Sequence, residues 1–213
     1  MRQKIKLQSE GEEIVGDFYL PCETAPIVTC CHGVEYGEEW DVVQRLPDAG
    51  LGVLIFPFRS RALDKRLSDL DSALDWVESH TARIGLFGHS LGGVTSLLKA
   101  AQDTRIKALV IWGTPAYFRP IEETARSSEG GDSYQDARRR GVIEIAERIT
   151  CPVLIVHGSS DETVPVEHAQ ILHDGFVASG QSPHVELRIV QAGHADNVDE
   201  VFDHAIDMFK AYL

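Results

Sequence analysis

The stretch from Arg83 to Leu98, RIGLFGHSLGGVTSLL, constrains the fold of this chain more tightly than any other part of the sequence. A short apolar run, Ile84–Phe87, has the length and the flanking residues of a buried strand. Apolar residues then recur at helical spacing from Val94 to Leu98. The segment therefore predicts a strand, a sharp turn and a helix, with Ser90 at the apex of the turn.

Glycines stand two residues before and two residues after this serine, at Gly88 and Gly92. Without Cβ atoms there, the strand and the helix can cross closely and hold the apex in a strained conformation that pushes Oγ outward. The positive end of the helix dipole then lies where an oxyanion would form. This is a G-x-S-x-G nucleophile elbow in the strand-turn-helix context that the motif requires. A plain glycine-rich turn is the alternative reading of these residues.

The rest of the chain alternates strand-like and helix-like patterns, which predicts a mostly parallel, doubly wound sheet of about eight strands. Length suits one domain, residues 1–213, and 43% apolar and 25% charged residues are ordinary for a globular protein. The other predicted strands are Ile5–Leu7 and Ile14–Leu20 as an opening antiparallel hairpin, then Ile27–Cys31, Val53–Phe56, Ala108–Gly113, Val153–Val156 and, as a sheet-edge strand, Val185–Val190. The other predicted helices are Glu38–Leu46, Asp64–Ser79 with Leu67, Leu70, Leu74 and Val77 on one stripe, Glu167–Phe176, and Asn197–Tyr212.

Ligands bind at the carboxyl ends of the strands in such a sheet, and chemically active residues occur at these ends. Asp161 follows one predicted strand and His194 follows the last. We expect His194 to act as general base toward Ser90, with Asp161 fixing the imidazole tautomer. Glu162 is the alternative acid, and the alternatives to these roles are a turn-forming aspartate and an exposed loop histidine.

An oxyanion hole requires two backbone amides aimed at the developing charge. The amide of Leu91 is one, and the second is expected at Val34, after the predicted strand that ends at Cys31. His32 and His157 each precede a glycine at a strand end, where we expect them to brace loops. The remaining histidines are read as packing or orienting (His89) or as surface or helix residues (His80, His168, His173, His184, His204), and no ligand spacing predicts a metal.

Together these motifs resemble the α/β-hydrolase superfamily. The residues are the elbow Gly88–Gly93, His32 with Gly33, the H-G-x-x-D-x-x-V-P stretch His157–Pro165, and Gly193 with His194. The H-G-x-x-D-x-x-V-P motif around Asp161 is similar to the small-esterase, feruloyl-esterase-like and serine-aminopeptidase-like or prolyl-oligopeptidase-like branches. The resemblance implies the α/β-hydrolase fold and a hydrolase that works through an acyl-enzyme, without a cofactor. Haloalkane dehalogenases and dienelactone hydrolases are disfavoured because those branches have Asp and Cys, respectively, at the elbow.

The segment 116–148 is longer than the usual connection in α/β units, and in this fold a lid is inserted at this position. Gly130 and Gly131 are the predicted hinge. The predicted substrate-binding residues are Tyr117, Phe118 and Tyr134, together with Glu35 and Tyr36 from the loop 35–40, which is acidic and aromatic where many relatives have glycines. Five arginines are read either as a site for a substrate carboxylate or phosphate, or as a solvated helix face: Arg119, Arg126, Arg138, Arg139 and Arg140.

A net charge of −13 argues against nucleic acid and anionic membranes as partners. The N-terminus lacks an apolar core typical of a signal peptide, so a cytoplasmic location is expected. The four cysteines, Cys22, Cys30, Cys31 and Cys151, are expected to be buried structural thiols. The expected partner is a small-molecule ester, and the expected assembly is a monomer or a homodimer.

Three functions remain open from the sequence. The first is hydrolysis of carboxylic esters with small to medium acyl or aryl groups through a Ser90 acyl-enzyme. The second is peptidase or amidase activity on the same triad, in which Glu35, Glu38 or Glu39 would bind a free amino terminus. The third is a binding member of the fold without catalytic activity, which would not react with a fluorophosphonate at Ser90.

Overall fold

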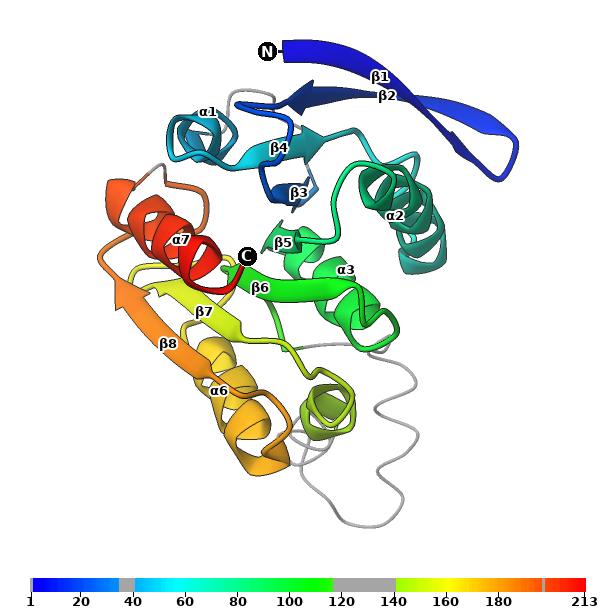
Figure 1. Ribbon diagram of the computed structural model, residues 1–213. Coiled ribbons are helices and arrows are strands. Elements are labelled where there is room, and N and C mark those ends of the chain that lie inside the picture. Colours follow the sequence, from blue (N-terminus) through cyan, green and yellow to red (C-terminus); the bar gives the residue numbers. More distant parts are fainter. Residues whose placement is uncertain (1, 35–40, 117–140, 197) are drawn as a thin grey trace.

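A computed structural model describes residues 2–34, 41–116, 141–196 and 198–213. These residues form a central sheet with helices on both faces (Figure 1). The strands are β1 (Arg2–Ser9), β2 (Glu12–Tyr19), β3 (Ile27–Cys31), β4 (Gly52–Ile55), β5 (Ile84–His89), β6 (Ile106–Trp112), β7 (Val153–Gly158) and β8 (Val185–Val190). The helices are α1 (Asp41–Asp48), α2 (Leu63–Glu78), α3 (Leu91–Ala100), α6 (Glu167–Ser179) and α7 (Asp199–Tyr212). None of them has the length and hydropathy to cross a membrane.

The sheet has eight strands in the order β1-β2-β4-β3-β5-β6-β7-β8. Neighbours from β4 through β8 run parallel, whereas β1 and β2 are antiparallel to each other and β2 is antiparallel to β4. This confirms the predicted doubly wound sheet, the opening hairpin and the edge position of β8. Because β3 to β8 are parallel, their carboxyl ends share one rim of the sheet.

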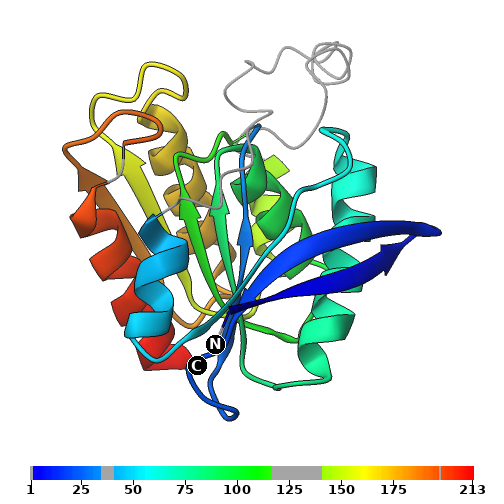
Figure 2. The same cartoon turned by 90° about the horizontal axis from the view of Figure 1, so that it is seen from above.

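Different helices cover the two faces of the sheet, as Figure 2 shows from above. One apolar core lies between the sheet and the helices α2, α3 and α6. The other lies between the sheet and the helices α1 and α7. Residues of β3, β4, β5 and β7 are buried along the whole strand, which explains their continuous apolar runs in place of alternation.

Two details of burial differ from the sequence predictions. The buried face of α2 includes Arg66, Leu70, Leu74 and Val77, and Leu67 is only partly buried. Of the four free cysteines, three are buried as predicted, but Cys22 is exposed. Cys22 follows Pro21 in the connection between β2 and β3.

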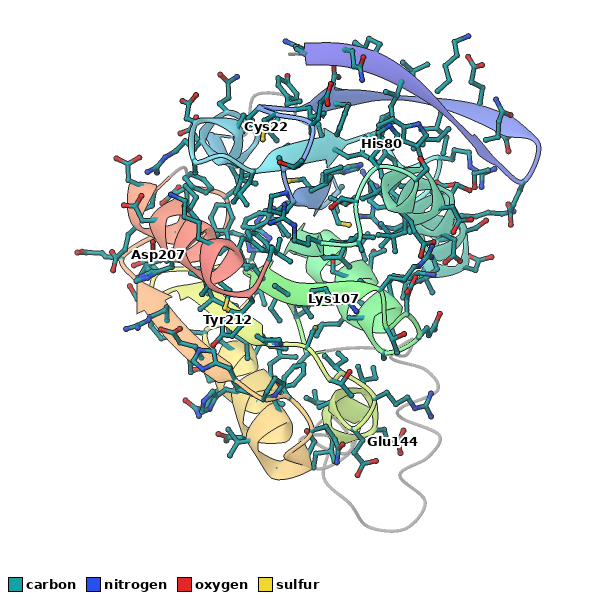
Figure 3. The ribbon with its side chains drawn as sticks, in the orientation of Figure 1. Cys22, His80, Lys107, Glu144, Asp207 and Tyr212 are labelled. Carbon is teal, nitrogen blue, oxygen red and sulfur yellow. The ribbon has the colours of Figure 1, made fainter. Side chains whose placement is uncertain are left out.

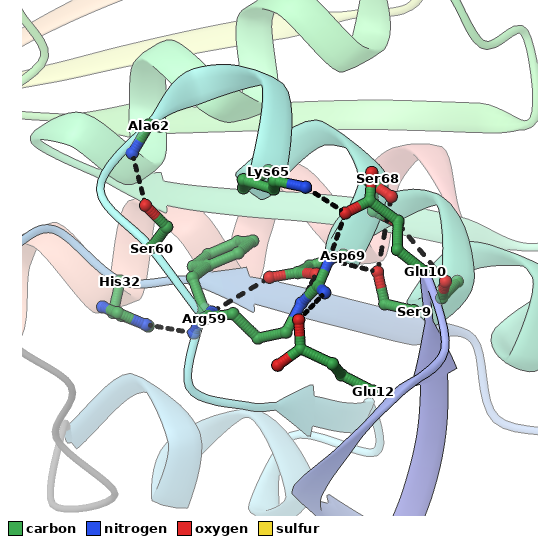
Figure 4. A network of polar contacts seen from close by, with 12 residues as sticks. Ser9, Glu10, Glu12, His32, Arg59, Ser60, Ala62, Lys65, Ser68 and Asp69 are labelled. Carbon is green, nitrogen blue, oxygen red and sulfur yellow. Dashed lines mark hydrogen bonds and ion pairs between the residues drawn. The ribbon is translucent and has the colours of Figure 1, made fainter.

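The tip of the β1-β2 hairpin is fixed to α2 through Arg59, which follows β4 (Figure 4). The Arg59 guanidinium binds the buried carboxylate of Asp69 at 2.6 Å and also contacts Glu10 at 3.1 Å and Glu12 at 2.8 Å. Lys65 adds a second contact to Glu10 at 2.5 Å. Exposed pairs of this kind contribute little individually, about 0–1 kcal/mol, so the buried Asp69 end of the network fixes its geometry.

Residues 141–146 are helical, and Val142 and Ala146 are buried in the core beside α6. This end of the predicted lid segment 116–148 therefore packs against the body of the protein. At its other end, the Ala116 amide donates to Nδ1 of the buried His168 at 3.0 Å. The intervening residues, 117–140, lie outside the described residues.

Candidate active site

Ser90 lies at the junction between β5 and α3, with φ 54° and ψ −121°. A left-handed φ is uncommon for a residue with a side chain and costs on the order of 1–3 kcal/mol. The chain tolerates it because β5 and α3 are fixed tightly around the turn. A Cβ added at Gly92 would lie 1.8 Å from the carbonyl oxygen of Cys31, so only glycine allows this approach of α3 to β3. The Ser90 amide donates to the Trp112 carbonyl at 2.9 Å, which ties the apex to β6.

The structure brings the side chains of Ser90, Asp161 and His194 together from three strand ends. His194 Nδ1 is 2.7 Å from Asp161 Oδ2, and His194 Nε2 is 3.0 Å from Ser90 Oγ. Because a carboxylate oxygen can only accept, Nδ1 carries the imidazole proton and Nε2 is left to accept the Ser90 hydroxyl proton. The Asp161 side chain has no exposed surface and the His194 side chain is 17% exposed. The imidazole therefore contacts a buried acid on one side and an accessible hydroxyl on the other.

The loop after β7 holds the acid in place. Asp161 Oδ1 accepts backbone N–H groups from Thr163 at 2.9 Å and Val164 at 2.7 Å, which leaves Oδ2 for His194. His157 Nε2 donates to the Val164 carbonyl at 2.8 Å, which confirms its predicted role as a loop brace. Glu162, the alternative acid, is exposed and makes none of these contacts within the described residues.

A second histidine fixes the loop that carries His194. His89 Nε2 donates to the backbone carbonyl of His194 at 2.7 Å, and its ring lies 4.9 Å from the His194 ring and 4.6 Å from the Trp112 ring. Burial lowers the pKa of His89 to about 4, so this imidazole stays neutral at neutral pH. The prediction that His89 packs and orients is confirmed by these contacts.

The loop after β3 lies directly against Ser90. A Cβ added at Gly33 would lie 3.2 Å from the Ser90 Cβ. Val34 follows in this loop, and Leu91 begins α3 directly after Ser90. Among the described residues, no hydrogen bond uses the backbone N–H of Val34 or of Leu91. One of these two amides lies in the loop after β3 and the other in the first turn of α3, and neither has a partner in the part of the chain that the structure describes.

Sequence reasoning missed Arg66, a buried arginine of α2 that donates hydrogen bonds to this loop. Its side chain is among the largest that are fully buried. The guanidinium donates to the carbonyls of His32 and Gly33, donates through Nε to Thr95 Oγ1 at 2.8 Å, and lies 3.8 Å from the centroid of the Phe58 ring. Burial lowers the pKa of Arg66 to about 10, which leaves it charged at neutral pH. A signal was present, because position 66 has helical spacing to the buried residues of α2.

His32 braces the same loop. Its Nε2 accepts the Phe58 amide at 3.1 Å and its Nδ1 donates to the Gly33 carbonyl at 3.1 Å. This confirms the predicted role of His32. The described residues contain no cluster of His, Cys, Asp or Glu that could hold a metal ion. The predicted substrate-binding residues, Glu35, Tyr36, Tyr117, Phe118 and Tyr134, together with Glu38, Glu39, the predicted hinge and the five arginines, lie outside the described residues.

The sequence model of the Dienelactone hydrolase family matches residues 52–202, which is more than half of the chain. The chain belongs to the dienelactone hydrolase family. The expectation that dienelactone hydrolases are disfavoured, because that branch has Cys at the elbow, is therefore wrong at the level of the family: the match extends across the elbow although position 90 is serine. Membership places the chain among the ester hydrolases of the α/β-hydrolase superfamily.

The chain is also similar to several relatives and solved structures. The chain is 25% identical over 226 residues to the uncharacterized protein YfhR of Escherichia coli K12, covering 96% of this chain and 76% of YfhR. It is 27% identical over 163 residues to a putative carboxymethylenebutenolidase of Methylorubrum extorquens, covering 75% of this chain and 46% of that protein. The fold matches the Pyrococcus furiosus esterase Pf2001 with a TM-score of 0.80 at 18% identity, covering 100% of this chain and 93% of that chain.

Proposed function

We propose that this member of the dienelactone hydrolase family is a serine hydrolase that cleaves carboxylic esters of small to medium acyl or aryl groups. The observation that carries the proposal is the hydrogen-bonded series from Asp161 Oδ2 through His194 to Ser90 Oγ, with distances of 2.7 and 3.0 Å. In this arrangement an imidazole accepts the hydroxyl proton while a buried carboxylate stabilises the positive charge that develops on the ring.

The acylation step uses each of these groups in turn. Ser90 Oγ attacks the ester carbonyl carbon as His194 Nε2 takes its proton, and a tetrahedral intermediate with a negative oxygen forms. The amides of Leu91 and Val34 are the proposed donors to that oxygen, and one such donor is worth about 10²- to 10³-fold in rate. When the intermediate collapses, the C–O bond breaks and the leaving alcohol takes the proton from His194.

Deacylation repeats the same chemistry with water. His194 Nε2 accepts a proton from a water molecule, which attacks the acyl carbon of the Ser90 ester. The second tetrahedral intermediate releases the carboxylic acid, and the proton returns to Ser90 Oγ. No cofactor is required for either step.

Labelling with a fluorophosphonate probe tests the nucleophile. We expect stoichiometric labelling of Ser90, detected by peptide mass spectrometry, and no labelling of the Ser90→Ala variant. The matched control is Ser159→Ala, because Ser159 is an exposed serine in the loop after β7 and its substitution should leave labelling unchanged. An unlabelled wild-type protein that is folded would support the binding protein without catalysis and contradict the proposal.

A substrate panel then tests the ester class. Rates on p-nitrophenyl esters should be highest for short acyl chains and aryl groups, and should fall beyond about eight carbons. Aminoacyl p-nitroanilides serve as the competing substrates. A rise in rate with acyl length, or faster turnover of the anilides than of the esters, would overturn the proposed substrate class.

A further inference from the structure

The edge strand β8 offers backbone groups for pairing with another strand. It is the terminal strand of the sheet and pairs, among the described residues, with β7 alone. The carbonyls of His184 and Val190 accept from Val153 and Ser159, so the even-numbered residues of β8 bond toward β7. Because bonding alternates along a parallel strand, the N–H and C=O groups of the odd-numbered residues, 185, 187 and 189, face outward.

This edge lacks most of the features that usually protect an edge strand. The register with β7 is continuous from Val185 to Val190, without a bulge, and the strand contains neither proline nor lysine. Ile189 is 47% exposed. A regular edge with an exposed apolar side chain is suited to pairing with a further strand. Two charged side chains, Glu186 and Arg188, lie on one face of the strand and pair with each other within the chain.

The sequence of β8, VELRIV, is complementary to itself in one antiparallel register. We propose that a second copy of this chain pairs with β8 about a two-fold axis at Leu187, so that Glu186 of each copy lies opposite Arg188 of the other. In this register 187 faces 187 and 185 faces 189 as hydrogen-bonded pairs, because their backbone groups all point outward. Glu186 and Arg188 then form directly opposed pairs on one face, which is the favourable arrangement for opposite charges.

The neighbouring registers are excluded by charge. The outward backbone groups of the two strands face each other only if one strand shifts by two residues relative to the other. Such a shift moves the two-fold axis by one residue, to Glu186 or to Arg188. In the first case two Glu186 side chains face each other, and in the second two Arg188 side chains do. Like charges directly opposite destabilise a strand pair. The charge pattern therefore selects the register centred on Leu187, which also places the exposed Ile189 opposite Val185.

A groove next to the strand also favours a second copy of this chain as the partner. It has a volume of about 260 Å³ and lies between β8 and α7, lined in part by Glu186, Arg188, Asp207 and Tyr212. Figure 3 labels Asp207 and Tyr212 on α7 beside this edge. An Arg188 side chain from the second copy, opposite Glu186, would meet the Asp207 carboxylate as its second acidic neighbour. The two-fold axis repeats this contact in the other groove.

Charge exchange tests the register directly. Analytical ultracentrifugation of the full chain in 150 mM NaCl should give a dimer, twice the 23.5 kDa of one chain. The single variants Glu186→Arg and Arg188→Glu should raise the dimer Kd at least tenfold, and the double variant E186R/R188E should restore it. Lys6→Glu, on the opposite edge strand β1, is the matched control and should leave the Kd unchanged. Circular dichroism verifies that each variant is folded.

A wild-type chain that stays monomeric at 100 µM would overturn the proposal, as would a dimer that survives both single variants. Failure of the double variant to restore the dimer would overturn the register. Cross-linking measures the register independently: in a Cys22→Ser background, which removes the exposed thiol, Glu186→Cys and Arg188→Cys chains should form disulfides when mixed and not alone. Disulfides within either variant alone would contradict the axis at Leu187. None of these measurements depends on the proposed catalytic activity.

Discussion

Substitution of Asp161 by asparagine separates the charge of the acid from its shape. The two backbone amides of Thr163 and Val164 donate to Oδ1, at 2.9 and 2.7 Å. The asparagine carbonyl oxygen should keep this position, since a reversed amide would lose both bonds, about 0.5–1.5 kcal/mol each, and place N–H groups against N–H groups. Its NH₂ group then faces His194 Nδ1, where the carboxylate now accepts at 2.7 Å.

A donor at that position selects the wrong imidazole tautomer. His194 would accept at Nδ1 and carry its proton on Nε2, so it could not deprotonate Ser90. If His194 returns to the productive tautomer, its Nδ1–H group faces the asparagine NH₂ group, and each unsatisfied donor costs about 1–3 kcal/mol. The hydrogen bond to a charged carboxylate, which contributes about 1.5–3 kcal/mol, is lost as well. These terms amount to roughly 5 kcal/mol, so kcat should fall about 10⁴-fold. KM should change little, because Asp161 lies on the side of His194 away from Ser90.

Initial rates on p-nitrophenyl acetate, with the active-site concentration set by fluorophosphonate titration of the wild type, measure this loss. Glu162→Gln is the matched control: it removes the neighbouring, exposed carboxylate and should leave kcat within twofold of the wild type. Urea denaturation checks that both variants are folded. A loss of less than about 30-fold in Asp161→Asn, or an equal loss in Glu162→Gln, would refute the assignment of the acid and the tautomer argument with it.

Three further predictions concern residues around the triad. Arg66→Met should lower kcat about 10- to 100-fold with little change in KM, because the Gly33 loop loses its hydrogen bonds to a charged side chain. Arg66→Lys should recover only part of the lost kcat. Steady-state kinetics and inhibition by a boronate measure the effect of both variants. The free energy of unfolding should fall by about 2 kcal/mol between pH 8 and pH 5 through His89, because the unfolded chain takes up a proton near pH 6.5 that the folded chain, with a pKa of about 4, excludes. His89→Gln should flatten this dependence in urea titrations at the two pH values, and an unchanged slope would contradict it. Gly92→Ala should destabilise the chain by more than about 3 kcal/mol, seen as a lower urea midpoint, since its Cβ would overlap the Cys31 carbonyl oxygen.

The sequence predicted the triad geometry because the rule that carries it is topological. Ser90, Asp161 and His194 each follow a strand, and parallel strands bring their carboxyl ends to one rim. Arg66 was not predictable in the same way. Its partners are backbone carbonyls of residues 32 and 33, which carry no signal in side-chain identity, and a charged residue on an amphipathic helix is ordinarily assigned to the solvent face. Its burial is set by the tertiary approach of α2 to the loop after β3.

The two loops that meet Ser90 are each fixed by a buried side chain from a neighbouring element. His89, the last residue of β5, holds the His194 carbonyl at 2.7 Å, and Arg66 binds both the loop after β3 and Thr95 of α3. Neither contact touches the reacting atoms, yet each sets the position of a loop that meets Ser90 relative to the elbow itself. Through these contacts, the positions of His194 and of the loop after β3 relative to Ser90 are set by residues outside the site itself.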